Sequence, residues 1–293
     1  MQLRWKASFS ASCLHAATSM HEGLPIADSK IAGLLQAPVA ALTSELTACG
    51  FAVEATLPLL AGLAADFENN RQLIERAAQR IQGAGAISGA AISRLAGCIA
   101  DLEAAWLREQ PNLVEELAVR GRPLRESWEA RGPGLLRAAE TLTVENFIAP
   151  AAEIVLVSPM VGGHGRAYLS ANQVAVEAVL TNPHEDLPEF MRLGWLLAQL
   201  HLDLPVLSEP IPPDRLPQLA SVATLPLVLA AAESVELATL DQQTLDRAIQ
   251  CWYLPSLPAD AATTLLDWWS AYRADNIRWP VAMAALAQML GSA

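Results

Sequence analysis

Histidines that stand beside glycines or acidic residues are the side chains of this chain that could do chemistry. His164 lies in the run Val-Gly-Gly-His-Gly over residues 161–165, which has the composition of a phosphate-binding loop. The run lacks the Gly-Lys-Ser/Thr ending of a P-loop, and a strand pattern follows it, so the sequence favours a flexible hairpin loop. His184 and His201 lie 17 residues apart, which is roughly 25 Å along one helix and too far for a single metal ion.

Serine and cysteine nucleophiles have no recognisable setting in the sequence. Neither Gly-x-Ser-x-Gly nor a cysteine in a strand-to-helix turn is found. The four cysteines are spread singly, without a Cys-x-x-Cys pair, so the sequence supports neither a disulfide framework nor a structural zinc site. Free thiols are typical of a reducing compartment. We therefore predict a cytoplasmic protein with neither a metal nor another cofactor.

Composition and charge predict a large folded core and argue against some partners. The chain has 293 residues, of which 53% are hydrophobic, and a formal net charge of −12. From Val144 onward, 16 acidic residues stand against 6 basic ones, which argues against nucleic acid or an anionic membrane surface. We find no stretch with the roughly 18 to 20 apolar residues of a membrane span. The predicted partners therefore include neither nucleic acid nor membrane.

Hydrophobic periodicity divides the chain into a helical first part and a mixed second part. Residues 1–143 have apolar residues at helical spacing, after a first stretch (1–27) that fits either a short strand or an ordered arm. Residues 144–293 begin with two strand patterns, over 153–157 and 166–180, joined by the glycine-containing loop. We predict a predominantly helical α+β fold, with a helical N-terminal region over 1–143 and, over 144–293, a core with a small sheet followed by helices. Helices are expected over 28–49, 57–82 and 87–110, in a shorter segment after residue 111, in one or two segments between 123 and 142, and over 187–204, 218–238, 241–253 and 259–290.

One of these segments, Leu187 to Leu204, is apolar on nearly every face and is therefore predicted to be a buried helix. The five residues from Met191 to Trp195 stand in it where the helix of a zinc metallopeptidase reads His-Glu-Leu-Gly-His. Together with the strands before it and the helix after it, the region from 153 to 236 resembles the core of zincin metallopeptidases of the gluzincin kind. In that family a strand pair precedes the motif helix, and a later helix supplies a glutamate as third zinc ligand.

The motif residues that would do chemistry are all replaced in this chain. Met191 and Trp195 stand in place of the two histidines, and Arg192 in place of the glutamate. A thioether and an indole cannot hold Zn²⁺ as two imidazoles do, and a guanidinium cannot act as a general base at neutral pH. Glu233, or less favourably Glu236, matches the third ligand. The resemblance therefore implies a catalytically inactive pseudopeptidase without a metal.

Arg192 is the one basic residue of this predicted buried helix, so we expect it to need an anionic partner. Our hypothesis is that its guanidinium takes the place of the lost metal charge and pairs with Glu233 or Glu236. An Arg192 that pairs with Glu189, one turn back, or that reaches solvent is the alternative.

The resemblance also implies where a peptide would bind. In peptidases of this kind an extended substrate lies along the strand before the motif helix, here 166–180, by adding a strand to the sheet edge. The peptide-facing residues would be Tyr168, Ser170, Asn172 and Val174. The sequence thus favours a non-catalytic protein that binds a peptide or protein partner in the former substrate cleft. The alternatives are an active hydrolase with an unrecognised metal site or nucleophile, and a structural or assembly protein that uses its helical N-terminal region.

Overall fold

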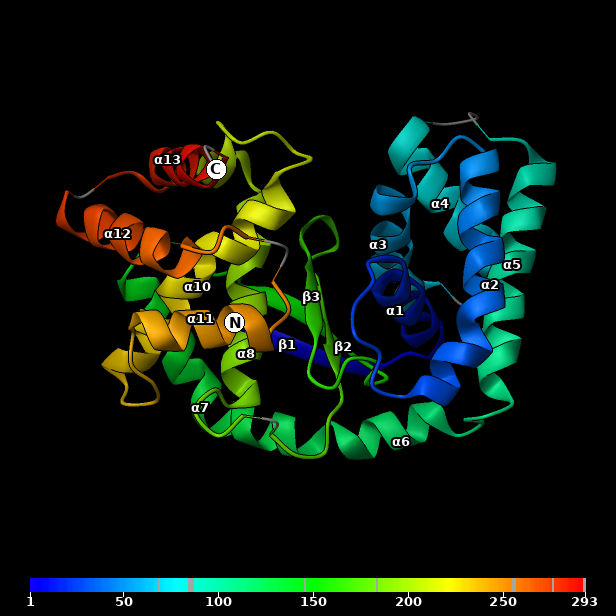
Figure 1. The fold of residues 1–293 in the computed structure, drawn as a ribbon, viewed down its shortest axis with the longest axis horizontal. Helices are drawn as coiled ribbons and strands as arrows, with labels where there is room; N and C mark the ends of the chain where they lie inside the picture. Colours follow the sequence, from blue (N-terminus) through cyan, green and yellow to red (C-terminus); the bar gives the residue numbers. More distant parts are fainter. Residues whose placement is uncertain are drawn as a thin grey trace.

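Helices pack on both faces of a small four-stranded mixed sheet in the computed structural model of the chain. The structure describes residues 1–67, 69–83, 87–144, 146–182, 184–254, 257–275 and 277–291. The predicted class, a predominantly helical α+β fold, is confirmed. Figure 1 shows the early helices, blue to cyan, on one side of the sheet and the later ones, green to red, on the other.

The sheet has the strand order β1-β2-β4-β3. Its strands are β1 (Gln2–Ala7), β2 (Ala151–Val157), β3 (Gly165–Tyr168) and β4 (Gln173–Glu177). The strands β1, β2 and β4 are parallel, and β3 is antiparallel to β4. The first stretch of the chain is therefore a strand that pairs with β2, so the parts 1–143 and 144–293 contribute to one sheet.

The predicted strand over 153–157 is confirmed as part of β2, but the single strand over 166–180 is wrong. The segment forms β3, a 3-10 turn η2 (Leu169–Ala171) and β4. Asn172, between them, has a φ of 52°, a left-handed conformation that asparagine tolerates and that reverses the chain. The alternating pattern therefore continues across a turn that periodicity alone does not detect.

The loop after β2 is also not a hairpin, because β2 and β3 lie on opposite sides of β4. Residues 158–164 must instead cross over the carboxyl end of β4. This crossing brings the glycine-containing run onto the last residue of that strand.

The helices of the first part lie on one side of the sheet, where they share one apolar core. Side-chain oxygens of Ser8 and Asp28 cap α1 and α2. The one helix expected over 57–82 is instead two, α3 and α4, with the side chain of Asn69 capping the second. The helices are α1 (Phe9–His21), α2 (Ser29–Ala48), α3 (Val53–Leu63), α4 (Asn70–Gln82), α5 (Gly89–Leu107) and α6 (Leu113–Arg120), with the 3-10 turn η1 (Ala64–Asp66).

The later helices cover the other face. The helix expected over 187–204 is α8, which passes into the 3-10 turn η3, and it is buried as predicted. The helix expected over 259–290 is two helices, α12 and α13. The elements are α7 (Arg122–Thr141), α8 (Glu189–Gln199), η3 (Leu200–Asp203), α9 (Pro205–Ser208), α10 (Leu216–Ser234), α11 (Gln242–Cys251), α12 (Ala261–Ala274) and α13 (Trp279–Gly291).

The sheet separates two apolar cores because successive strand residues point to opposite faces. Val155 and Ala175 pack with α1 to α5, whereas their neighbours Ile154, Val174 and Val176 pack with α7, α8 and α10 to α13. The helix α7 thus belongs to the later core although it precedes residue 143.

Two helices are long and apolar enough to cross a membrane, judged by length and composition alone. They are α2 and α10, and in α10 most of the apolar window (72%) is buried inside the protein. The expectation that no stretch is apolar enough for a span is therefore not met. The cytoplasmic location stays a prediction.

Candidate functional site

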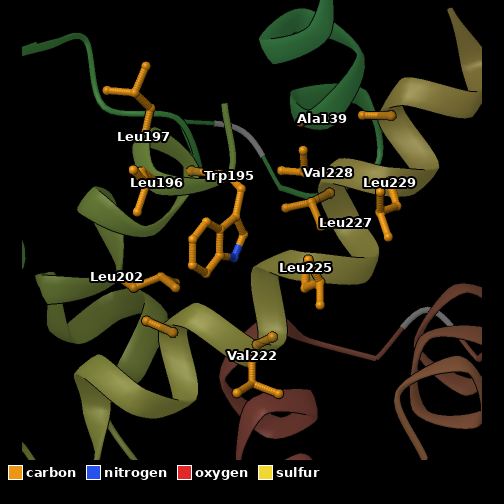
Figure 2. Packing of buried hydrophobic residues seen from close by; sticks show 14 of the residues in the cluster. Ala139, Trp195, Leu196, Leu197, Leu202, Val222, Leu225, Leu227, Val228 and Leu229 are labelled. Atoms are coloured by element: carbon orange, nitrogen blue, oxygen red, sulfur yellow. The ribbon is translucent and has the colours of Figure 1, made fainter. Parts of the chain in front are cut away.

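The motif positions of α8 are filled by buried side chains that already have partners. Met191 lies in the later core. Trp195 stacks on Trp252, at the end of α11, with 5.3 Å between ring centroids, and its Nε1 donates a hydrogen bond to the Ser221 carbonyl at 2.7 Å. Figure 2 shows the indole of Trp195 among apolar side chains that include Leu202. An indole therefore occupies the position that matches the second histidine.

Arg192 is fully buried, and its partners differ from those of our hypothesis. Its guanidinium donates to the carbonyls of His164 and Glu177 and pairs with the carboxylate of Glu189. The alternative partner one turn back is thus the one formed. Burial raises the pKa of Glu189, and the Arg192 charge offsets only part of this rise.

The pairing of Arg192 with Glu233 or Glu236 is not formed. Both glutamates are exposed. The Glu233 carboxylate accepts a hydrogen bond from the Leu240 N–H at 3.1 Å, and Glu236 follows the end of α10 in a left-handed conformation, with a φ of 59°. Arg192 pairs with Glu189 because both residues lie on the same helix, about one turn apart.

A second buried charge, Glu177, lies at the carboxyl end of β4. Its carboxylate accepts hydrogen bonds from five successive backbone N–H groups, those of residues 160–164, at 2.8–3.0 Å. Such a converging set of N–H groups is an anion-binding nest. Gly162 and Gly163 have φ angles of 94° and 134°, which side chains other than glycine rarely allow. The glycine run does bind an anion, and that anion is the chain's own carboxylate.

His15, on α1, contributes a side-chain hydrogen bond to this carboxylate. Its Nε2 donates to the Glu177 Oε1 at 3.0 Å, and both side chains are buried. Burial alone would raise the pKa of Glu177, but the hydrogen bond and charge of His15 and the Gly163 N–H outweigh it and hold this pKa well below its usual range. Glu177 is therefore a permanently ionised, fully hydrogen-bonded group, which suits it to fix the loop rather than to take up protons.

His164 lies at the end of the nest, between the two layers. Its ring stacks on His15 with 5.7 Å between centroids and meets the edge of Tyr253 at 5.9 Å. Burial, together with the charge of His15, lowers the pKa of His164 to about 3, so the imidazole is neutral. Within the described residues its Nδ1 has no hydrogen-bond partner.

This polar cluster stands where the carboxyl ends of the three parallel strands meet, beside α1, which carries His15. Open α/β sheets bind ligands at this edge. Sequence reasoning missed His15 and Glu177 as partners because they lie 162 residues apart. A signal was present: Glu177 is the one charged residue in the apolar strand pattern 173–179, and a buried carboxylate requires donors.

The four residues expected to face a peptide do not lie along one strand. Tyr168 ends β3 and packs over Gly62, whereas Ser170 is exposed in η2. Asn172 is in the turn, where its side chain donates to the Ala151 carbonyl. Val174 is in β4, whose two edges are already paired with β2 and β3. A peptide cannot add to β4.

A groove of about 400 Å³ opens outside Tyr253. Leu24 and Tyr253 pack against the earlier core, whereas Ile249, Leu254 and Leu257 pack against the later core, so the groove follows the seam between the two. These apolar side chains are all partly exposed. The groove is lined by Leu24, Asp246, Ile249, Gln250, Tyr253, Leu254, Leu257, Pro258, Ala259 and Ala261.

No protein-family model, curated protein or solved structure matches the chain. In the part of the chain that the structure describes, no three or more histidine, cysteine, aspartate or glutamate side chains are grouped to hold a metal ion.

Proposed function

We propose that this chain is a non-catalytic, zincin-like protein that binds a peptide or an extended segment of a partner protein. The observation that carries the proposal is that the motif positions of α8 are filled by paired side chains. Trp195 is stacked beneath Trp252, and Arg192 is held by Glu189 and two carbonyls. The chain's own side chains therefore fill the place where a peptidase would hold its metal and water.

We assign the groove outside Tyr253 as the binding site of the partner. Tyr253 directly follows Trp252, so the groove lies beside the residue that closes the motif helix. Its partly exposed apolar lining would gain from covering by an apolar side chain, at about 25 cal/mol for each Å² removed from water. This binding site replaces the strand-addition site that the resemblance implied.

An active hydrolase is the second candidate, and the His15–Glu177 pair is the observation that favours it. A carboxylate that orients an imidazole is the arrangement of many acid–base catalysts. Here, however, the carboxylate also accepts five backbone hydrogen bonds, and the described grooves include neither residue of the pair. The pair therefore fits an anchor for the loop better than a catalyst.

A displayed library of random peptides, selected on the purified chain, tests the proposal. We expect enrichment of peptides with aliphatic or aromatic residues, and loss of their binding to an Ile249→Asp variant. The matched control is Val281→Asp on α13, a side chain that is 55% exposed and lies outside the groove; it should bind as the wild type does. Equal binding of the peptides to the wild type and to the Ile249→Asp variant would contradict the proposed binding site.

A cleavage assay separates the two candidate functions. The selected peptides are incubated with the protein, with and without added zinc, and analysed by mass spectrometry. We expect them to stay intact under both conditions. Turnover of a selected peptide that is lost in a His15→Asn variant would favour the hydrolase instead.

A further inference from the structure

The outer face of α11 carries a row of side chains that changes from polar to apolar toward the groove. Gln242, Asp246 and Gln250 follow one another at four-residue steps and therefore lie on one side of the helix. A shallow depression of about 450 Å³ covers this side. It shares Asp246 and Gln250 with the groove outside Tyr253, so the two hollows are continuous.

Asp246 is the charged group that this continuous surface offers to a ligand. Arg247 also lines the polar depression, but it forms an ion pair with Asp186. Among the described lining residues, Asp246 is the carboxylate without an ion-pair partner. The chain around it is acidic, with a formal net charge of −12, which favours a cationic ligand group over an anionic one.

The remaining polar residues of this surface are amides. Gln242, Gln243 and Gln250 are exposed, and each amide is both a donor and an acceptor of hydrogen bonds. Such groups suit the alternating N–H and C=O groups of an extended backbone. Their position beside an apolar groove favours a peptide over a small apolar molecule.

We propose that the groove selects peptides in which an apolar residue is accompanied, within about three positions, by a lysine or arginine that pairs with Asp246. The spacing follows from the lining: Asp246 lies on α11 about one turn before Ile249, and Leu254 follows the end of that helix. Three residues of extended chain span about 10 Å, which is enough to reach from one to the other. The apolar side chain enters beside Ile249 and Leu254, and the cation reaches Asp246. This inference rests on the proposed function and names the ligand class of the same site.

The test uses peptides recovered from the selection on the wild-type chain, labelled with a fluorophore and titrated by polarisation. Each is compared with a version in which its lysine or arginine is replaced by glutamate. We expect the basic version to bind about three- to fivefold more tightly, as an exposed ion pair allows. An Asp246→Lys variant should reverse this preference. The matched control is Asp267→Lys, the same charge change at an exposed position of α12 outside the groove, and it should keep the preference.

The outcomes for the two proposals are distinguishable. Peptides that need Ile249 but have no basic residue, or a preference that Asp246→Lys leaves unchanged, would overturn the charge selection while the proposed function stands. A loss of the preference in the Asp267→Lys control would show an effect of total charge only, and would also overturn it. A selection that recovers no peptide on the wild-type chain would overturn the proposed function itself. Peptides whose binding does not depend on Ile249 would overturn the assigned groove and, with it, the charge selection.

Discussion

The two buried charges beside the end of β4, Glu177 and Arg192, are stabilised in different ways. Glu177 is held mostly by backbone N–H groups of a crossing loop, with His15 as the one side-chain donor among the described residues. Arg192 is held by two carbonyls and by Glu189 from its own helix, and its Nε has no partner among the described residues. Backbone donors keep their positions when side chains change. The site of the Glu177 carboxylate therefore depends mainly on the path of the backbone, whereas the site of the Arg192 guanidinium also depends on the side chain of Glu189.

The largest effect is expected for Glu177→Ala. Removal of the carboxylate leaves five N–H groups, four of them buried, without an acceptor, so we expect a loss of about 3–5 kcal/mol in the free energy of unfolding. Urea denaturation measures it. Because the emptied nest is still an anion site, formate should restore part of the stability of the variant but not change the wild type. Glu153→Ala, at a partly exposed carboxylate paired with Arg4 and Lys6, is the control, with a loss of about 1 kcal/mol or less.

A loss below about 1 kcal/mol for Glu177→Ala, or equal effects of formate on both proteins, would contradict the nest as the main support of this charge.

Arg192→Met should cost about 3 kcal/mol, because Glu189 and two carbonyls lose their partner. The double variant Arg192→Met with Glu189→Gln should recover at least half of this loss, since no unpaired charge is then buried. Thermal unfolding of the single and double variants gives the comparison. No recovery would mean that the carbonyls, rather than the ion pair, dominate the cation site, and the contrast with Glu177 would disappear.

The pH dependence of stability should come from both His164 and Glu177, in different ranges. His164 has a folded pKa of about 3, below the usual histidine value of 6.5. The unfolded chain therefore takes up a proton that the folded chain does not, and stability falls as the pH drops below 6.5, by at most about 1.4 kcal/mol per pH unit. The lowered pKa of Glu177 acts in the same direction once the pH falls below about 4.5.

His164→Asn should flatten the decline between pH 6.5 and 4.5 and leave the steeper one below it. His21→Asn, at an exposed position outside the cluster, is the control and should keep the wild-type profile. An unchanged profile in His164→Asn would assign the dependence to other groups.

The smallest effect on stability is expected for Tyr253→Gly. Tyr253 has a φ of 52°, so glycine relieves about 1 kcal/mol of strain and loses an edge contact with His164 of similar size. The net change should lie within about 1 kcal/mol. The variant should also expose His164, which modification by diethylpyrocarbonate followed by mass spectrometry detects. A protected His164 in this variant would show that Tyr253 does not cover it.

The sequence supplied the local elements better than the contacts between them. The buried helix α8 and the strand β2 follow from periodicity, and the need of Arg192 for an anion follows from the cost of burying a charge. The identity of that anion was left open: helical spacing offers Glu189, one turn back, whereas the resemblance implied Glu233 or Glu236, and the structure forms the pair with Glu189. The nest around Glu177 needs the crossing of the loop over β4, which depends on strand order. The turn at Asn172 was also not predicted, because the alternating pattern of the sequence continues on both sides of it.

The pairing of β1 with β2 has a consequence for how the chain is made. The strand β1 leaves the ribosome well before its partner β2 at residues 151–157, because α1 to α7 lie between them in the chain. Its closing contact spans a long loop and therefore forms slowly compared with helices and their local packing. During synthesis the apolar residues of β1 and the sheet-facing side of α1 stay uncovered until β2 emerges. We expect nascent chains that stop before residue 150 to bind chaperones, and chains that extend past β4 to be released from them.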